Sequence, residues 1–211
     1  MKIERIVFAT GNAGKIREIQ AILADLGLEV ASMKEAGVSA DIEEDGCTYE
    51  ENALIKSRAV AACLKKAGRL EGTVVMADDS GLEIDYLNKE PGVFSARYMG
   101  EDTSYRIKNA NLVGRLEGVE EARRTARFVC AIAAVLPDGT ELSAEGTVEG
   151  LIAHEPAGDG GFGYDPIFYL PEYGMTSAQI PIEKKNEISH RGKALEAMKA
   201  KLKSLYGEED R

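Results

Sequence analysis

The chain has 211 residues, of which 44% are hydrophobic and 29% are charged, a composition typical of a soluble globular protein. Its net charge of −10 would repel a nucleic-acid backbone, so we expect no nucleic-acid partner, and a small anionic substrate would need local cations or a metal. The longest apolar run covers residues 128–136, too short to cross a membrane, and the N-terminus does not resemble a targeting signal. We therefore expect a cytoplasmic protein with no membrane partner.

Cysteine usage gives no sign of a disulfide framework or a zinc site. Cys47, Cys63 and Cys130 are odd in number and widely spaced, and no CxxC pattern or Cys/His cluster accompanies them. The sequence therefore predicts reduced thiols.

Hydrophobic periodicity and turn residues predict an α/β fold with a mixed central sheet flanked by helices. The turn signal Pro137-Asp138-Gly139 between two apolar segments indicates a hairpin, which excludes a purely parallel sheet. Thr48 and Glu51 have the spacing of a capping box, which predicts the start of a long helix. In chain order we expect a strand over residues 3–9, a turn over 10–15, a helix over 16–26, a strand over 28–31, an acidic loop over 41–46, a helix over 48–68, a strand over 73–78, a loop over 88–100, a helix over 102–116, hairpin strands over 125–136 and 140–149, a glycine-rich loop over 157–163, a helix over 194–205 and a charged tail over 207–211, with residues 1–206 forming a single domain.

Two adjacent carboxylates, Asp78 and Asp79, follow the apolar run at residues 73–77. Ser80-Gly81 predicts a turn after them, so the acids would lie at the carboxyl end of a buried strand, where ligands bind in open α/β sheets. Charging neighbouring carboxylates there is unfavourable unless a cation or a proton is shared. The alternative is that the two acids only cap a turn.

Two earlier segments have the composition of a phosphate and metal site. The loop at residues 10–15 joins a strand to a helix, so its backbone amides and Lys15 could hold phosphate oxygens, although it lacks the spacing of a Walker motif. The loop at residues 41–45 could supply an acid that joins Asp78 or Asp79 on a hard divalent ion, since oxygen donors suit Mg²⁺ or Mn²⁺. The alternatives are that residues 10–15 form an ordinary strand–helix turn, and that the acids of residues 41–45 only stabilise the N-terminus of the following helix.

Two later segments predict a nucleotide-binding surface. Residues 158–166 hold two aromatic side chains and Asp165 in a glycine-rich frame, where a base could stack on a ring and donate to the carboxylate. Residues 184–193 gather cations at the opening of the terminal helix. The alternatives are a surface loop with buried aromatics and a solvated charged face.

Six motifs occur in one order and at compatible spacing. They are Thr10-Gly11-Asn12-x-x-Lys15, Glu51-Asn52-Ala53, Ala77-Asp78-Asp79-Ser80-Gly81-Leu82, Pro91-Gly92-Val93-Phe94-Ser95-Ala96-Arg97-Tyr98, Gly161-Phe162-Gly163-Tyr164-Asp165-Pro166 and Ile188-Ser189-His190-Arg191-Gly192-Lys193-Ala194-Leu195. Together they resemble the inosine/xanthosine triphosphate pyrophosphatase family, over nearly the whole chain.

The resemblance implies an enzyme that hydrolyses non-canonical purine nucleoside triphosphates (ITP, dITP and XTP) to the monophosphate and pyrophosphate, cleansing the nucleotide pool. It implies Mg²⁺ as the cofactor, with Mn²⁺ as a substitute. It also implies an elongated, two-lobed α/β fold with the active-site cleft between the lobes, and a homodimer.

The resemblance further implies roles for single residues. Asp79 would bind the metal and accept the proton of the attacking water, with Asp78 beside it as a further ligand and the alternative base. Glu43 would be the metal ligand of the acidic loop, an assignment open by one residue. The substrate-binding residues would be Thr10, Gly11, Asn12, Ala13, Gly14, Lys15, Lys56, Ser80, Phe162, Gly163, Tyr164, Asp165, Lys185, His190 and Arg191.

Two rival classes of function remain open at the level of sequence. A nucleotide-binding module without catalysis would use the loop and the cations but would leave the paired carboxylates superfluous. A carboxylate-pair glycosidase would not need Lys15, Lys56 or Lys185. Release of pyrophosphate from inosine triphosphate separates all three.

Overall fold

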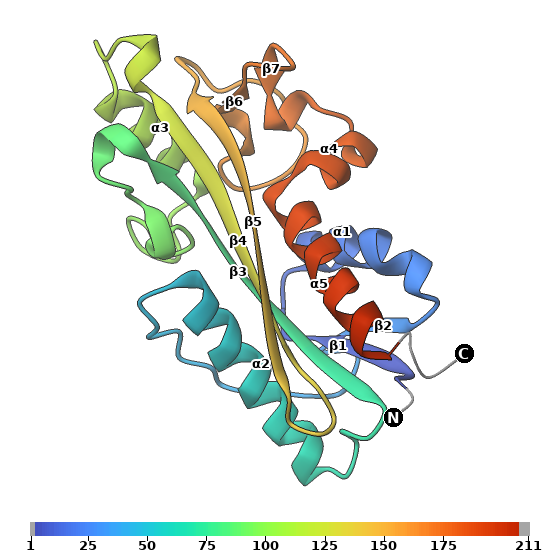
Figure 1. Ribbon diagram of the computed structural model, residues 1–211. Coiled ribbons are helices and arrows are strands. Elements are labelled where there is room, and N and C mark those ends of the chain that lie inside the picture. The colour runs from blue at the N-terminus through green and yellow to red at the C-terminus, as the bar shows by residue number, and fades with distance from the viewer. Residues whose placement is uncertain (1–2, 207–211) are drawn as a thin grey trace. The chain divides into compact units, whose positions relative to one another are not determined.

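The computed structural model describes residues 3–206, so the predicted tail at residues 207–211 lies outside the described residues. These residues form seven β-strands and five α-helices (Figure 1), which confirms the α/β prediction. None of the helices in this range combines the length and the hydropathy that crossing a bilayer needs. The strands are β1 (Arg5–Phe8), β2 (Glu29–Ser32), β3 (Thr73–Ile84), β4 (Thr125–Val135), β5 (Glu141–Ile152), β6 (Phe168–Leu170) and β7 (Met175–Thr176), and the helices are α1 (Ala13–Leu23), α2 (Tyr49–Lys66), α3 (Tyr105–Arg115), α4 (Ile182–Ile188) and α5 (His190–Tyr206).

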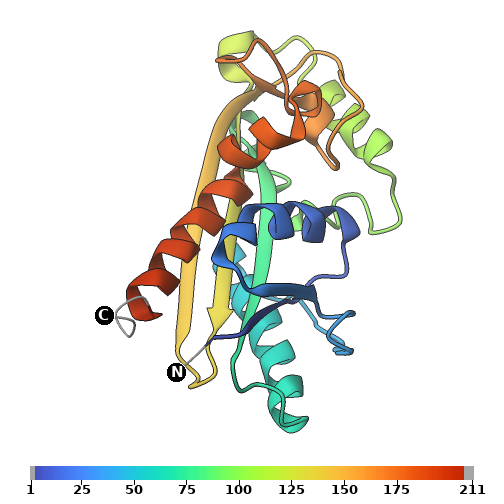
Figure 2. The same ribbon diagram turned by 90° about the vertical axis from the view of Figure 1, so that its right-hand side faces the viewer.

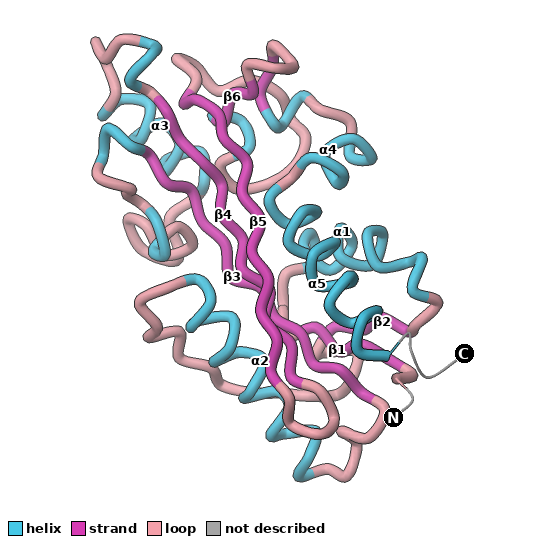
Figure 3. The backbone as a smooth tube through the Cα atoms, viewed as in Figure 1, coloured by secondary structure: helices cyan, strands magenta, loops and turns pink. Residues whose placement is uncertain are grey.

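The strands form one mixed sheet in the order β2-β1-β3-β4-β5-β6-β7 (Figure 3). β1 runs parallel to β2 and β3, whereas β6 runs antiparallel to β5 and β7, which confirms the predicted mixed sheet. The predicted hairpin joins β4 to β5, and the amide of Leu136 donates to the carbonyl of Thr140 across the turn at 2.9 Å. The sequence analysis missed β6, β7 and α4 because elements of 3, 2 and 7 residues carry no readable period.

The chain folds into two compact units. Within the described residues, the first unit comprises the chain up to Asp79, the segment Cys130–Gly146 and the chain from Arg191 onward. The second unit comprises Ser80–Val129 and Thr147–His190. The strands β3, β4 and β5 contribute residues to both units. That residues 1–206 act as a single domain stays a prediction.

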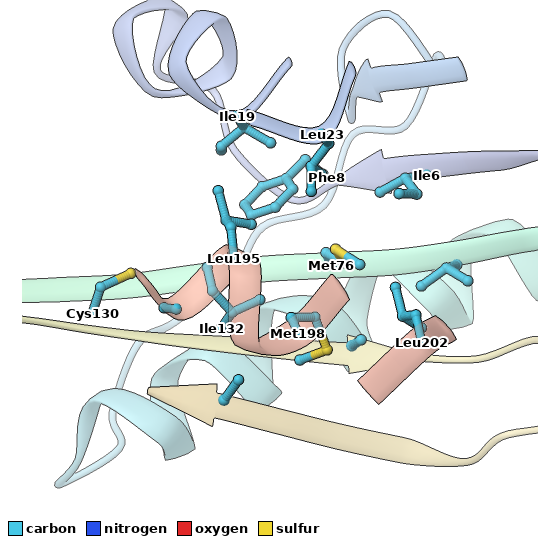
Figure 4. Packing of buried hydrophobic residues seen from close by; sticks show 14 of the residues in the cluster. Ile6, Phe8, Ile19, Leu23, Met76, Cys130, Ile132, Leu195, Met198 and Leu202 are labelled. Atoms are coloured by element: carbon cyan, nitrogen blue, oxygen red, sulfur yellow. The ribbon is translucent and has the colours of Figure 1, made fainter. Parts of the chain in front are cut away.

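Alternation along β3 builds two cores in the first unit. Val74 and Met76 pack into a core with side chains of α1 and α5, several of which are labelled in Figure 4. Val75 and Ala77 belong to a second core that includes side chains of α2. Figures 1 and 2 show α1 and α5 covering one face of the sheet and α2 the other. Because successive side chains of a strand point to opposite faces, even-numbered residues of this part of β3 meet α1 and α5, and odd-numbered residues meet α2.

The predicted turn at Ser80-Gly81 is wrong. β3 continues through these residues to Ile84 without interruption. Leu82 and Ile84 are fully buried in the core of the second unit, so the apolar pattern resumes after the acids and holds the segment in the sheet. Local turn preference is overridden by this burial, and the acids lie inside a strand rather than at its end.

The predicted helix start is confirmed for α2, whereas the starts of α1, α3 and α5 differ from the predicted residues 16, 102 and 194. Thr48 and Glu51 form the predicted capping box at the start of α2. α1 begins at Ala13 rather than at residue 16, because the side chain of Asn12 caps it. The cations of residues 184–193 do not open one helix as expected, since Ser189 is extended and separates α4 from α5.

Candidate active site

The two acids of β3 occupy different environments because they point to opposite faces of the sheet. Asp78 faces α1 and α5, where its Oδ2 lies 2.9 Å from Lys15 Nζ and 3.3 Å from Arg191 Nη2. Asp79 faces α2, where Asn52 Nδ2 donates to its Oδ2 at 3.1 Å and Lys56 Nζ lies 3.4 Å from its Oδ1. The two carboxylates are therefore held apart, and each has its own cation.

Asp78 is a buried anion held by cations. Burial alone would raise its pKa, but the charges of Lys15, Arg191 and Lys56 outweigh burial and hold the pKa of Asp78 below its usual range. Arg191 is itself buried, and its Nη1 donates to Glu18 Oε2 at 2.6 Å. A carboxylate with these partners stays ionised at neutral pH and fixes the ammonium of Lys15.

Asp79 has the opposite electrostatics. Burial raises the pKa of Asp79 above its ordinary value, and the charge of Lys56 and the hydrogen bond from Asn52 reduce this effect only in part. The negative charge of Glu44 acts in the same direction as burial, and its Oε2 accepts from Lys56 Nζ at 2.7 Å. Adjacent carboxyl groups whose pKa values are pushed apart are typical of a site that moves protons.

No role was predicted from the sequence for Asn52 or Glu18, although Asn52 lies in one of the motifs. Asn52 stands one helical turn from Lys56 on α2, so their i, i+4 spacing could have indicated a shared face. Glu44 is the acid of the 41–45 loop that contacts Lys56, and it is one of the acids among which the sequence left the metal ligand open. Glu18 pairs with Arg191 across 173 positions of sequence, and no local signal predicts that contact. The assignment of Glu43 as a metal ligand stays a prediction.

We call Glu18, Glu44, Asp78, Asp79, Lys15, Lys56 and Arg191 the acid–lysine cluster. It holds four carboxylates and three cations, so its formal charge is negative, and its anionic donors are all oxygens. No three His, Cys, Asp or Glu side chains within residues 3–206 are gathered to hold a metal ion. That arrangement still fits Mg²⁺, because this ion is commonly bound by one or two carboxylates, with substrate phosphates and water completing its shell.

The loop before α1 is more ordered than the sequence suggests. Asn12 Oδ1 accepts from the amides of Gly14 at 2.8 Å and Lys15 at 3.2 Å, and the amide of Asn12 donates to Thr10 Oγ1 at 3.1 Å. These three amides, which were predicted to hold phosphate, therefore already have partners. A phosphate on the amides of Gly14 and Lys15 would have to displace the Asn12 side chain. Gly11 is exposed and Ala13 begins the helix.

Beside Lys15 and Asp78 lies a buried thiol that takes no part in this chemistry. Burial raises the pKa of Cys130 to about 12, so the thiol is neutral at physiological pH. All three cysteines are free, as the sequence predicts.

In the second unit, the glycine-rich loop is organised around a buried carboxylate. Asp165 Oδ2 accepts from the amide of Phe162 and from Lys185 Nζ, both at 2.7 Å, and its Oδ1 accepts from Ser177 Oγ at 2.8 Å. A Cβ at Gly161 would lie 2.2 Å from Asp165 Oδ2, and the φ of +70° favours glycine there. The glycine thus lets the backbone wrap closely around the acid.

An aromatic ring stands next to this carboxylate. Phe162 is 36% exposed, and Lys185 Nζ lies 5.1 Å from the centre of its ring. His190 is buried and stacks on Phe128, with ring centres 4.8 Å apart. The second unit therefore offers an accessible aromatic surface beside a paired cation and acid.

The predicted site residues thus form two groups. The first unit brings together Thr10 to Lys15, Lys56, Asp78, Asp79 and Arg191, and the second holds Ser80, Phe162, Gly163, Tyr164, Asp165, Lys185 and His190. Two placements differ from expectation. Arg191, predicted to grip the base and phosphates, has its described ion pairs with Asp78 and Glu18, and Tyr164 is only 4% exposed. A contact of either side chain with substrate stays a prediction.

The sequence comparisons agree on one family. The model of the Ham1 family matches residues 6–201. The chain is 45% identical over 203 residues to a dITP/XTP pyrophosphatase of Clostridium perfringens, with 96% of this chain and 99% of that protein covered. It is 50% identical over 196 residues to a dITP/XTP pyrophosphatase of Nitratidesulfovibrio vulgaris, with 90% and 91% covered.

Solved structures agree with the sequence relatives. The Ham1 protein of Staphylococcus aureus has a TM-score of 0.82 and 42% identity, with 95% of this chain and 99% of that chain covered. A HAM1 protein of Coxiella burnetii also has a TM-score of 0.82, with 41% identity and 96% and 100% covered. The similarity in fold and in sequence therefore extends over nearly the whole length of both proteins.

The two acids should differ in what they contribute to stability. Asp78→Asn removes the buried negative charge that Arg191 and Lys15 share, so the free energy of unfolding should fall by about 3–5 kcal/mol at pH 7. The fold raises the pKa of Asp79, so its ionised form costs stability above that pKa, and Asp79→Asn should change the free energy of unfolding by less than about 1 kcal/mol. Urea denaturation of both variants measures the difference. Equal losses would contradict the separation of the two environments.

Proposed function

This chain belongs to the Ham1 family, and we propose that it hydrolyses the triphosphates of inosine, deoxyinosine and xanthosine to the nucleoside monophosphate and pyrophosphate. Relatives that share about half of its residues over their full length are dITP/XTP pyrophosphatases. The observation that carries the proposal is the pair of acids on β3. One is permanently charged and holds cations, and its neighbour has a raised pKa. Such an enzyme would cleanse the nucleotide pool.

Asp79 is the proton acceptor in this proposal. A general base works best when its pKa approaches the working pH, and burial moves Asp79 in that direction. Its carboxylate takes the proton of a water that attacks the α-phosphorus, and the bond to the pyrophosphate breaks. Asp78, the alternative base, is less suited because its cations keep its pKa low and its oxygen occupied.

The cations of the acid–lysine cluster bind the triphosphate. Lys15 and Lys56 are each held by carboxylates, so their ammonium groups are oriented before the substrate arrives. A positive charge fixed in advance stabilises the negative charge that develops on the pyrophosphate. Burial would lower the pKa of Lys56, but Asp79, Asp78 and Glu44 raise it, so the group stays charged at neutral pH.

The metal would be held by Asp79 and an acid of the 41–45 loop, with Asp78 as a further candidate. Glu43 is the candidate from the resemblance, and Glu44 is the acid that shares Lys56 with Asp79. When bound, Mg²⁺ offsets phosphate charge and orients the chain for in-line attack. Oxygen-only donors and the negative formal charge of the cluster support this ion.

The second group of residues would bind the base. The exposed face of Phe162 offers a stacking surface, and Asp165 would accept from a ring N–H of the purine. A 6-keto oxygen accepts a hydrogen bond from Lys185 or His190, whereas the 6-amino group of adenine cannot. A buried donor left without a partner costs about 1–3 kcal/mol, so adenosine triphosphate is disfavoured.

One nucleotide would engage both groups, its triphosphate on the acid–lysine cluster and its base on the glycine-rich loop. This requires the cleft between two lobes that the resemblance implies. We also propose that the enzyme is cytoplasmic and works as a homodimer, as the family resemblance implies.

Pyrophosphate release is the decisive assay. The protein with Mg²⁺ should release pyrophosphate from inosine and xanthosine triphosphates, with kcat/KM on the order of 10²-fold above that for adenosine triphosphate. A coupled pyrophosphate assay with inosine, xanthosine, adenosine and guanosine triphosphates measures this ratio. Binding of a triphosphate without release of pyrophosphate would indicate a nucleotide-binding module instead. Equal rates on inosine and adenosine triphosphates would disprove recognition of the 6-keto group.

The titration of the Asp79 carboxyl in the metal-free protein tests its environment. Its ionised form is lost as the pH falls through its raised pKa, so an NMR titration should place that pKa above the ordinary value of 3.8. Lys56 lowers the pKa of Asp79 more than Lys15 does, so Lys56→Met should raise that pKa further and Lys15→Met should raise it less. Asp79→Asn should lower kcat of the Mg²⁺-loaded enzyme by roughly 10²–10⁴-fold. An unchanged pKa of Asp79 in Lys56→Met would contradict the role given to Lys56.

Metal dependence separates the candidate ligands. Activity should vanish with a chelator and return with Mg²⁺ or Mn²⁺. A variant that removes a metal ligand should raise the Mg²⁺ concentration needed for half-maximal rate by about tenfold or more. Glu43→Gln and Glu44→Gln are therefore measured beside a control, Glu50→Gln, which changes an exposed acid of α2. Full turnover in excess chelator would reject the metal, and a variant that matches the Glu50→Gln control is not a ligand.

A further inference from the structure

The segment Pro91 to Tyr98 is one of the motifs in the sequence, yet none of the proposed catalytic steps uses it. Its most buried polar residue is Ser95, which is 4% exposed. Ser95 follows a short turn at residues 92–94. Within the second unit it is hydrogen-bonded to β3 and to the glycine-rich loop. A buried serine in a loop without a known role requires an explanation.

Ser95 is hydrogen-bonded to two separate parts of the chain as well as to its own turn. Its Oγ accepts from the amide of Leu82 at 2.9 Å and donates to the carbonyl of Gly92 at 2.6 Å. Its carbonyl accepts from the hydroxyl of Tyr164 at 2.6 Å. Leu82 stands three residues after Asp79 on β3, and Tyr164 lies within the glycine-rich loop. One residue therefore connects the strand that carries the acids to the loop that carries Phe162.

The side chain of Tyr164 faces inward. It is 4% exposed, and its ring makes an edge contact with Tyr105 of α3, with ring centres 5.2 Å apart. A second bond comes from the same helix, since Asn109 Nδ2 donates to the carbonyl of Gly163 at 3.1 Å. The side chain of Tyr164 thus anchors the backbone of its loop, although the sequence motif suggests a direct contact with substrate.

We propose that Ser95 and Tyr164 are positioning residues that hold the glycine-rich loop in the shape that receives the purine base. They do so through the Tyr164 Oη to Ser95 carbonyl bond, and they act on substrate only through Phe162 and Asp165. This inference rests on the proposed function for the identity of the ligand. The anchoring of the loop itself rests on the contacts alone.

The loop needs such an anchor because of its composition. Gly161 and Gly163 have φ values of +70° and +68°, a region that glycine enters freely, so little in the backbone itself selects this shape. Ordering a flexible loop at the moment of binding costs affinity, and a loop ordered beforehand avoids that cost. A buried tyrosine hydrogen-bonded to a buried carbonyl supplies this order, because breaking the bond would leave both groups without a partner.

Tyr164→Phe is the direct test, with Tyr98→Phe as its matched control. Both changes remove one hydroxyl and keep the ring. Tyr98 belongs to the same motif, but its hydroxyl is hydrogen-bonded to Asn111 and Arg115 at 2.8 Å, whereas that of Tyr164 is bonded to the Ser95 carbonyl. Ser95→Ala is a poorer choice, since it leaves the buried amide of Leu82 unpaired and could prevent folding.

The first measurement is independent of activity. The chain contains no tryptophan, so Phe162→Trp introduces a single fluorescent reporter into the loop. In this background, Tyr164→Phe should raise the acrylamide quenching constant by about twofold, and Tyr98→Phe should leave it unchanged. Equal quenching in all three proteins, or an equal rise in both variants, would overturn the anchoring.

The second measurement is the split between KM and kcat without the reporter. Tyr164→Phe should raise KM for inosine triphosphate roughly five- to tenfold, the equivalent of about one hydrogen bond, with kcat within about twofold. The preference over adenosine triphosphate should fall, and Tyr98→Phe should match the wild type. A raised KM with unchanged quenching would mean that Tyr164 touches the substrate directly, and this would overturn the positioning role. An unchanged KM in Tyr164→Phe would also overturn it. If the wild type cleaves no nucleoside triphosphate, the proposed function fails, and the quenching data still decide whether the loop is anchored.

Discussion

The chemistry of this protein depends on the alternation of side chains along one strand. Asp78 and Asp79 are neighbours in sequence, yet their carboxylates lie on opposite faces of β3 and meet different helices. The ion pairs of Asp78 with Lys15 and Arg191 fix one acid as a permanent anion. On the opposite face, Asp79 meets Lys56, which also pairs with Glu44, and the side-chain amide of Asn52. These two groups lower the pKa of Asp79 less than burial raises it, so its pKa is raised. Two identical residues thus acquire different roles because a strand has a period of two.

This arrangement also shows which sequence inferences are reliable and why. The apolar run before the acids predicted a buried strand correctly, because burial on both faces leaves a continuous hydrophobic run. The turn at Ser80-Gly81 was wrong because turn preference is local, whereas Leu82 and Ile84 are held by a core built from distant segments. The error matters for mechanism. Acids at a strand end would share one solvent-facing site, but acids inside a strand are separated by the sheet.

Most residues of the site could be predicted from the sequence, but the ion pairs and hydrogen bonds between them could not. Asp78, Asp79 and Lys15 lie in motifs that stand out in the sequence, and Lys56 was indicated by the family resemblance. Their partners Glu18 and Asn52 came from helices whose registry against β3 is set by packing. The Arg191 to Glu18 pair spans 173 positions, and only the packing of α1 and α5 on the same face brings those residues together. Motifs therefore predict which residues belong to the site, and the packing of the fold determines which of them form ion pairs with one another.

The same reasoning explains why the site carries a cost in stability. A carboxyl whose pKa is raised by burial is less stable in its ionised form in the folded chain than in the unfolded chain, so Asp79 weakens the fold at the pH where it can act as a base. The fold offsets this cost with the Asp78 ion pairs on the other face of the same strand, where the pKa is depressed. The stabilising and the destabilising carboxylate are thus adjacent residues of one strand. Within the second unit, Leu82 of the same strand bonds to Ser95, and Ser95 bonds to Tyr164, so this part of β3 is tied to the loop proposed to bind the base.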